Sequence, residues 1–247
     1  MNVNRTYRNR MHNDDLVSFT VAVRETDLFI SIGSDNWSPE IPKEVEKLVH
    51  SLRFDLEKYI EFDPEFKTAL NPHPLAPGAP LIARTMAQAA NTAGVGPMAA
   101  VAGAFAELVG KFLLKLSSDV IVENGGDIFI GSTKTRRAAI FAGASPFSNL
   151  LAVEFPPERT PLGICTSSGT VGPSLSFGKA DAAVIMANSA ALADAVASAA
   201  GNVVHSPGDV KKGIKIAKGF KDVLGAVIIK DDQLAAWGGF DLVPIDR

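Results

Sequence analysis

The chain has 247 residues, of which 47% are hydrophobic and 21% are charged, and this composition excludes disordered, collagen-like and coiled-coil proteins. A chain of this length buries enough apolar surface to form a core without metal ions or disulfides. Its 24 basic and 27 acidic residues give a net charge of −3, which argues against nucleic acid as a partner. The single cysteine, Cys165, excludes an internal disulfide and any metal site with several cysteine ligands.

The sequence shows neither an export signal nor a clear membrane span. Residues 1–15 contain several charged side chains and no apolar segment of the kind that directs export, so we expect a cytoplasmic protein. Residues 85–106 carry no charge, but they are rich in Ala and Gly and include Pro97. We interpret this stretch as two buried helices and expect no membrane partner.

The first half of the chain predicts a hairpin followed by helices. Apolar residues alternate over 16–24 and 28–32, which indicates two paired strands. Ser38 and Pro39 are typical of a helix start, and apolar spacings of three and four predict a helix from there to Tyr59. Four prolines within 71–80 predict a loop, and helices are predicted over 81–92 and 97–116. The last helix has a narrow face of small residues, against which we expect close packing: Ala99, Ala102, Gly103, Ala106 and Gly110.

Beyond residue 119 the pattern changes to short apolar runs. These runs predict strands over 120–122, 128–130, 138–141, 150–155, 182–186, 223–229 and 234–237, with helices over 189–200 and 210–220. Strands and helices come in clusters and do not alternate strictly. The sequence therefore predicts an α+β fold, a largely antiparallel sheet with packed helices, and no flexible linker divides 1–247, which we expect to form a single domain.

The segment Glu123-Asn124-Gly125-Gly126-Asp127 has two interpretations. Asn-Gly between two apolar runs is typical of a type I′ hairpin turn. Alternatively, the two glycines remove side chains where a ligand approaches the backbone, with the flanking acids as hydrogen-bond acceptors or metal ligands. A one-residue change of register would turn each acid to the opposite face of the sheet, so the sequence leaves the orientation of both open.

A second candidate segment, 165–170, places four hydroxyls and a glycine after an apolar run: Thr166, Ser167, Ser168, Gly169 and Thr170. Backbone N–H and hydroxyl groups of this kind can bind a phosphate, but a surface turn has the same composition. The segment lacks the G-x-S-x-G pattern of hydrolase nucleophiles. Cys165 has no histidine near it in sequence, so we do not expect it to act as a nucleophile.

Two further segments carry candidate ligand-binding residues. Asp194 and Ser198 are four residues apart in a predicted helix, so both oxygens project from one face and could hold a cation such as Mg²⁺. In the alternative interpretation Asp194 caps or pairs with another element. Gly94 and Gly96 precede a helix at Pro97 whose free N–H groups could face an anion, although the context excludes a Rossmann dinucleotide site.

Taken in order, three of these motifs resemble the signatures of the ApbE-like superfamily, best known for FAD:protein FMN transferases. They are Asn124-Gly125-Gly126-Asp127-Ile128, Thr166-Ser167-Ser168-Gly169 and Ala193-Asp194-Ala195-Val196-Ala197-Ser198. Segments 25–28, 93–103, 122–127 and 165–170 more closely resemble a branch of that superfamily whose members are uncharacterised, and this likeness covers nearly the whole chain. The likeness to the transferases rests mainly on 94–201.

The resemblance implies a T-fold-related α+β domain that binds a flavin nucleotide between the glycine-rich strand region and a metal-binding helix. It implies Mg²⁺ at Asp194 and Ser198, and transfer of FMN from FAD to a protein hydroxyl with release of AMP. Two departures set this chain apart from the transferases. Their His-His-Ile-x-Asp-Pro segment is replaced by Gly-Pro-Ser-Leu-Ser-Phe at 172–177, without histidine, and 94–103 lacks their Lys-Gly pair.

Three functions follow from these observations. The first is a Mg²⁺-dependent enzyme that transfers or hydrolyses a phosphoester of a flavin nucleotide, with FAD as the leading substrate. The second is a binding protein for a flavin, pterin or similar ring that catalyses no transfer. The third is a structural module, since the small-residue helix faces would also suit a homo-oligomer.

Overall fold

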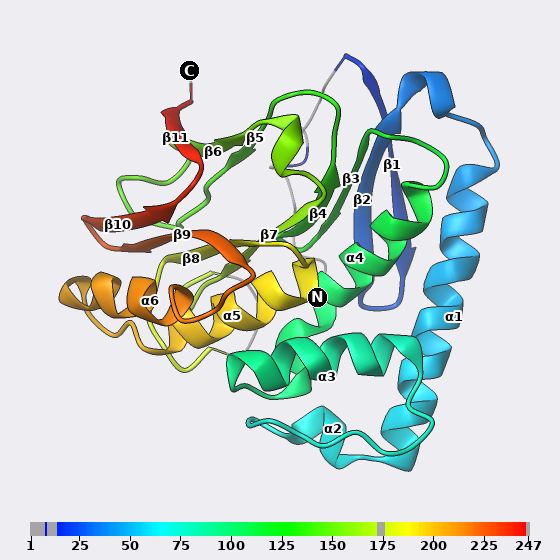
Figure 1. The fold of residues 1–247 in the computed structure, drawn as a ribbon, viewed down its shortest axis with the longest axis horizontal. Coiled ribbons are helices and arrows are strands. Elements are labelled where there is room, and N and C mark those ends of the chain that lie inside the picture. The colour runs from blue at the N-terminus through cyan, green and yellow to red at the C-terminus, as the bar shows by residue number, and fades with distance from the viewer. Residues whose placement is uncertain (1–7, 9–13, 172–175, 246–247) are drawn as a thin grey trace.

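An eight-stranded antiparallel sheet forms the centre of the computed structural model, which describes residue 8 and residues 14–171 and 176–245 (Figure 1). Its strand order is β1-β2-β3-β4-β7-β8-β9-β10, and every neighbouring pair is antiparallel. The strands are β1 (Leu16–Val23), β2 (Thr26–Gly33), β3 (Val120–Asn124), β4 (Asp127–Gly131), β7 (Leu162–Ser167), β8 (Ala182–Ala187), β9 (Val223–Lys230) and β10 (Gln233–Gly238).

Helices cover one face of this sheet, and a small second sheet covers part of the other. In Figure 1, α3, α5 and α6 lie below the large sheet, while β5, β6 and β11 lie above it. The second sheet has the order β11-β6-β5. Its strands are β5 (Arg136–Ala139), β6 (Leu151–Phe155) and β11 (Asp241–Pro244), and the helices are α1 (Ile41–Phe62), α2 (Glu65–Thr68), α3 (Leu81–Ala93), α4 (Val101–Leu113), α5 (Ala190–Asn202) and α6 (Val210–Ala217).

Each face of the large sheet has its own hydrophobic core. Alternate residues such as Val122 and Phe129 pack with the helices in the larger cluster. Their strand neighbours, such as Ile130, pack with Val153 and Phe155 of the second sheet. Because side chains alternate between the faces of a strand, the register of β3, β4 and β7 decides which polar residues meet the helices.

The structure confirms the α+β fold and most predicted elements, but several elements differ. The N-cap of helix α1 is Glu40, so the prediction that the helix starts at Ser38 is wrong. The backbone carbonyl of Ser38 accepts the Ile41 N–H. Strand β7 was missed because Pro161 and Gly163 interrupt the apolar pattern. Gly163 is required there, since a Cβ would come within 2.2 Å of the Ala190 Cα. Strand β11 was also missed.

Close packing occurs at the predicted small-residue face. A Cβ on Gly103 would lie 2.3 Å from the Ala190 carbonyl oxygen of α5, and one on Gly110 would lie 2.0 Å from the Phe129 ring. The predicted helix over 97–116 is a short 3₁₀ helix, η3 (Pro97–Ala100), followed by α4. Within the described residues, no single helix is long and apolar enough to cross a membrane, although α3 together with Pro97–Leu113, bent by 104°, meets the length and composition criteria as a pair.

Candidate functional site

The β3–β4 turn is a two-residue hairpin loop at Gly125 and Gly126. Asn124 pairs with Asp127 in the register, so the two glycines form the loop and Asn124 ends the strand. Their φ angles are 69° and 107°, in the region that favours glycine. The hairpin prediction is thus confirmed, with the turn one residue later than Asn-Gly would place it. A Cβ on Gly126 would meet nothing within 4 Å, so open space adjoins the tip.

The register places Asp127 and Glu123 on opposite faces of the sheet. Asp127 shares its face with Asn124 and Val122, the face that packs against the helices. The amide of Asn124 donates to the Ala102 carbonyl at the start of α4 (3.1 Å). Glu123 lies on the other face, where its carboxylate pairs with Arg8 (2.7 Å) and also accepts the Gly126 N–H (2.8 Å).

Asp127 is buried at the junction of β4, β7 and the helices. Its Oδ1 accepts the backbone N–H of Thr166 in β7 (3.3 Å). Burial raises the pKa of Asp127 to about 7, with a further contribution from the negative charge of Glu123, while hydrogen bonds from Cys165 and the Thr166 N–H oppose the rise. A carboxyl group in this environment holds its proton up to near-neutral pH unless a cation approaches.

Asp194 reaches from α5 to the first turn of α4. Its Oδ2 accepts the Gly103 N–H (2.8 Å), and the Ala102 N–H also favours its charged form. The N-cap residue of α4, Ala100, has no side-chain acceptor, so Asp194 supplies the cap from another helix. This geometry agrees with the alternative interpretation from sequence, in which Asp194 caps or pairs with another element. Loss of hydration, with the negative charge of Asp127, nevertheless raises the pKa of Asp194 well above its ordinary value.

Cys165 lies beside both aspartates, and we call Asp127, Cys165 and Asp194 the carboxylate cluster. Burial and the two negative charges raise the pKa of the Cys165 thiol well above its ordinary value. Its Sγ donates to the Ala190 carbonyl (3.2 Å). A buried, protonated thiol is a poor nucleophile, which agrees with the interpretation from sequence.

Two of the hydroxyls of 166–170, those of Ser168 and Thr170, are held by hydrogen bonds. The Ser168 Oγ accepts the N–H groups of Thr170 (3.1 Å) and Val171 (3.0 Å). The Thr170 hydroxyl donates to Asp181 (2.9 Å). Thr166 and Ser167 are the last residues of β7, and Gly169 packs against the Gly178 backbone. The cluster and this loop are therefore adjacent, joined by Thr166. The segment 172–177, which has no histidine, falls largely on 172–175, and these four residues lie outside the described residues.

The other candidates lie at helix ends and on α5. Gly94 ends α3 with a φ of 75° and faces open space, while Gly96 packs closely on the Ala69 carbonyl. The η3 turn that follows contacts α5. Ser198 is one turn beyond Asp194 on α5 and is partly buried. The ligand-binding role of these residues stays a prediction.

Sequence reasoning missed Glu107. This carboxylate is 4% exposed in the middle of α4, where it accepts the Ser189 hydroxyl (2.5 Å) and the Ala191 N–H (3.1 Å) at the start of α5. A lone acid within the otherwise apolar run 104–110 was the available signal, because charged residues are rarely buried without partners.

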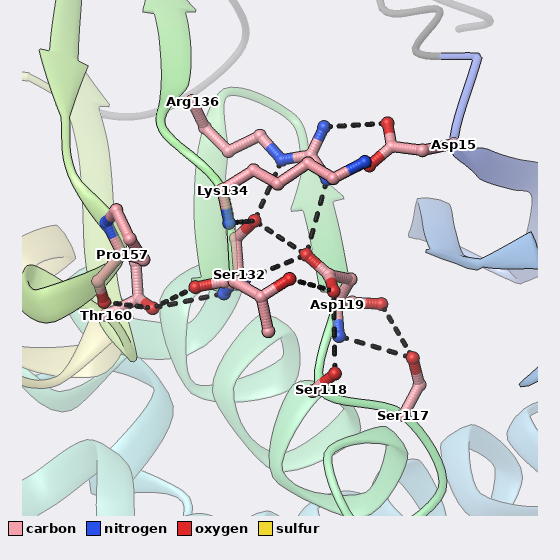
Figure 2. A network of polar contacts seen from close by, with 10 residues as sticks. Asp15, Ser117, Ser118, Asp119, Ser132, Lys134, Arg136, Pro157 and Thr160 are labelled. Atoms are coloured by element: carbon pink, nitrogen blue, oxygen red, sulfur yellow. Dashed lines mark hydrogen bonds and ion pairs between the residues drawn. The ribbon is translucent and has the colours of Figure 1, made fainter.

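A second polar cluster, the Arg136 network, lies at the far end of β3 (Figure 2). The Arg136 guanidinium contacts Asp15 (2.7 and 3.0 Å) and Asp119 (3.3 Å). Ser132 and Thr133 complete the set by donating to Asp119 (2.7–2.9 Å). This network joins the start of β1, the start of β3 and the β4–β5 connection.

A surface groove of about 380 Å³ opens elsewhere, between the β1–β2 hairpin and α1. Arg24, His50, Arg53 and Phe54 line it, and the carboxylate cluster does not. Among the described residues, no group of three His, Cys, Asp or Glu side chains is placed to hold a metal ion. A cation at Asp194 would therefore need further oxygen ligands from the backbone, Ser198, water or a bound phosphate.

Comparisons with known proteins agree with this architecture. The family model described as AbpE bacteria matches residues 8–220. A UPF0280 protein of Methanothrix thermoacetophila is 43% identical over 197 residues, covering 79% of this chain and 81% of the relative. A UPF0280 protein of Methanosarcina barkeri is 38% identical over 234 residues, covering 92% and 90%.

Solved structures show the same fold at low sequence identity. The flavinyl transferase ApbE of Pseudomonas stutzeri, in its apo form, matches with a TM-score of 0.56 and 15% identity, covering 95% of each chain. The flavin transferase ApbE of Vibrio cholerae matches with a TM-score of 0.55 and 12% identity, covering 90% of this chain and 96% of that one. The chain therefore belongs to the AbpE bacteria family, within the ApbE-like superfamily, and has an ApbE-like α+β fold.

Proposed function

We propose that this protein is a Mg²⁺-dependent enzyme that acts on a flavin nucleotide, with FAD as the leading substrate. Its fold is that of proteins named flavin transferases, and the three motifs that resemble theirs lie close together: the β3–β4 turn, the end of β7 and the middle of α5. The proposed chemistry is transfer or hydrolysis of the FMN phosphoester.

The observation that carries this proposal is the carboxylate cluster. Asp127 and Asp194 come from β4 and α5, and both have a raised pKa. Within the described ranges, no Lys, Arg or His forms an ion pair with either of them. Two adjacent carboxyl groups without a cation are costly to ionise, and a divalent ion is the partner that would offset this cost.

Oxygen ligands of this kind suit Mg²⁺, which prefers carboxylates and keeps several water or phosphate ligands. Asp194 and Ser198 would hold the ion, with Asp127 close by. When bound, Mg²⁺ would neutralise the charge of the pyrophosphate of FAD. The N–H groups of Ala102 and Gly103 already fix the orientation of the Asp194 carboxylate, so the ligand is preorganised by the first turn of α4.

Other residues around the cluster would contact the nucleotide. The backbone at Gly126 faces open space, which leaves room for a ligand against the hairpin tip, and Gly94 does the same at the end of α3. The backbone N–H of Thr166 donates to Asp127 and so fixes its carboxyl group. The other hydroxyl residues of this loop come next along the chain, at 167–170. We propose Asn124, Gly125, Gly126 and Asp127, with this hydroxyl loop, as the nucleotide contacts.

The proposed reaction breaks one P–O bond in the pyrophosphate of FAD. A hydroxyl of a protein acceptor, or water, forms the new bond to the FMN phosphorus and loses its proton, and AMP leaves with the bridging oxygen. No histidine occurs at 172–177, where the transferases carry two. This absence favours a second candidate, a flavin-binding protein without transfer activity, and the same experiment separates the two.

The test is the melting temperature of the metal-stripped protein with FAD, with and without Mg²⁺. Ligand at about 100 times its Kd adds about 3 kcal/mol to the unfolding free energy, and this corresponds to a shift of about 5–10 °C for a chain of this size. We expect the full shift only with both ligands present, followed by release of AMP on longer incubation. A shift without AMP release would instead support the binding protein.

Matched variants locate the effect. Asp194→Asn keeps an oxygen that can accept the Gly103 N–H but removes the charge, so we expect it to lose the Mg²⁺-dependent shift. Asp209→Asn is the control, because Asp209 caps the turn before α6 and lies outside the cluster. Absence of any shift in the unmodified protein would contradict the proposed function, whatever the variants do.

A further inference from the structure

Helices α4 and α5 exchange carboxylate caps. Asp194 of α5 accepts the Gly103 N–H in the first turn of α4 (2.8 Å). Glu107 of α4 accepts the Ala191 N–H in the first turn of α5 (3.1 Å) and the hydroxyl of Ser189, its N-cap (2.5 Å). Each helix thus satisfies free N–H groups at the start of the other, which neighbouring residues in sequence normally do.

The two contacts lie one turn apart on each helix. Gly103 and Glu107 are separated by four residues on α4, and Ala191 and Asp194 by three on α5, so each pair shares one helix face. Between them the helices come so close that a Cβ on Gly103 would lie 2.3 Å from the Ala190 carbonyl oxygen. Two anchors and a close approach leave α5 little freedom to rotate or slide.

We propose that Glu107 is a positioning residue for Asp194: its bond to the start of α5 fixes the rotation of that helix and so aims the Asp194 and Ser198 oxygens at the ligand site. The claim that Glu107 affects metal binding rests on the function proposed above. The claim that Glu107 fixes the position of α5 does not, because the exchanged caps are formed by the chain alone.

The chemistry of Glu107 suits this task. One carboxylate oxygen, Oε2, accepts both groups at the start of α5, and the other, Oε1, pairs with Lys111, which lies at the surface. Removing Lys111 would break only the outer pair, since its side chain is 59% exposed. Removing Glu107 would leave the Ser189 hydroxyl and the Ala191 N–H without their acceptor.

The first measurement is amide hydrogen exchange at Gly103, which reports the bond to Asp194 in the absence of any ligand. In Glu107→Ala we expect the Gly103 N–H to exchange at least about tenfold faster relative to the Val109 N–H in the same helix. Leu113→Ala is the matched control: it removes a buried side chain from α4, so general destabilisation should accelerate both amides together. Equal acceleration in Glu107→Ala would overturn the inference.

The second measurement is the Mg²⁺ concentration that gives half of the FAD-dependent melting shift. Loss of a residue that orients a metal ligand typically weakens metal binding about 10- to 100-fold, and we expect that increase in Glu107→Ala, with a smaller one in Glu107→Gln, which keeps one acceptor oxygen. Lys111→Gln and Leu113→Ala should leave the midpoint unchanged. A Glu107→Ala protein with the unmodified midpoint would overturn the inference.

The two measurements separate the two proposals. An unmodified protein that never responds to Mg²⁺ and FAD would contradict the proposed function, yet selective loss of Gly103 protection in Glu107→Ala would still support the positioning role. A normal Mg²⁺ response with unchanged Gly103 protection in Glu107→Ala would contradict the positioning role alone.

Discussion

The carboxylate cluster and the Arg136 network each hold two aspartates, but their electrostatics are opposite. In the Arg136 network, hydrogen bonds from Arg136 and Lys134 hold the pKa of Asp15 well below its usual value. Burial opposes the same change at Asp119, but bonds from Thr133, Ser132 and Arg136 still lower its pKa. In the carboxylate cluster, burial raises the pKa of both Asp127 and Asp194, and like charge adds to the rise at Asp194.

This difference separates a structural site from a candidate binding site. The Arg136 network supplies its own cation, and its polar atoms are joined by bonds within the chain. The carboxylate cluster has backbone N–H donors but, in the described part of the chain, no cationic side chain paired with it. Perturbed carboxyl groups gathered at one place are typical of functional sites.

The largest effect is expected from breaking the Arg136 network. Arg136→Met removes the only guanidinium among the groups shown in Figure 2 and leaves Asp15 and Asp119 without it. The Asp15 and Asp119 side chains are 29% and 16% exposed and Asp15 keeps its pair with Lys134, so we expect a loss of about 3 kcal/mol of unfolding free energy, the upper end for a buried group that loses its hydrogen-bond partner. Urea denaturation at pH 7 measures this loss.

The neighbouring residue provides the control. Arg137 follows on the same strand, but its side chain is 58% exposed, where it pairs with Glu154. Exposed ion pairs contribute about 0–1 kcal/mol, so Arg137→Met should change the unfolding free energy little. Equal losses in the two variants would show that the Arg136 network is no stronger than a surface pair.

The pH dependence of stability should differ in sign between the two regions. A carboxyl whose folded pKa is raised binds more protons in the folded state, so the unfolding free energy falls as pH rises from about 4 to about 7. With Asp127 at a pKa of about 7, we expect the metal-free protein to lose about 2–3 kcal/mol over this range. Urea denaturation at a series of pH values measures the loss.

Two variants assign this slope. Asp127→Asn should be more stable than the unmodified protein at pH 8 and nearly equal to it at pH 4. The lowered pKa values of Asp15 and Asp119 give stability that is present above about pH 4 and lost below it, so Asp15→Asn should be less stable above about pH 4, have a shallower acid limb and keep the slope between pH 4 and 7. Asp194, whose pKa is also raised, should leave a residual slope in Asp127→Asn, so an unchanged slope between pH 4 and 7 in that variant would contradict this assignment.

The smallest effect is expected at the cap. Asp194→Ala removes the acceptor of the Gly103 N–H, and loss of a helix cap costs about 1 kcal/mol of unfolding free energy. Because the pKa of Asp194 is raised, we expect this cost in full in acid solution and a smaller one as pH rises, where the variant also loses an unfavourable charge. Asp194→Asn should be close to neutral in acid solution. An Asn variant as unstable as the Ala variant would show that Asp194 does not act as a cap.

Particular residues show how far sequence reasoning reaches. The glycine pair after Asn124 and the apolar alternation around it predict the β3–β4 hairpin, because both signals are local. Local sequence does not decide the orientation of Glu123 and Asp127; the pairing of Asn124 with Asp127 in the sheet does. Glu107 was missed because its partners, Ser189 and Ala191, are more than 80 residues away in the chain.

The sequence by itself determines most of the elements, the α+β class and the resemblance to the ApbE-like superfamily, since periodicity, turn residues and motif order depend on neighbours along the chain. Only the tertiary structure decides that Asp127, Cys165 and Asp194 lie together, that Asp194 caps α4 and that Arg136 keeps its two aspartates charged. These properties arise from burial and from charges brought close by folding, and neither is encoded in local spacing.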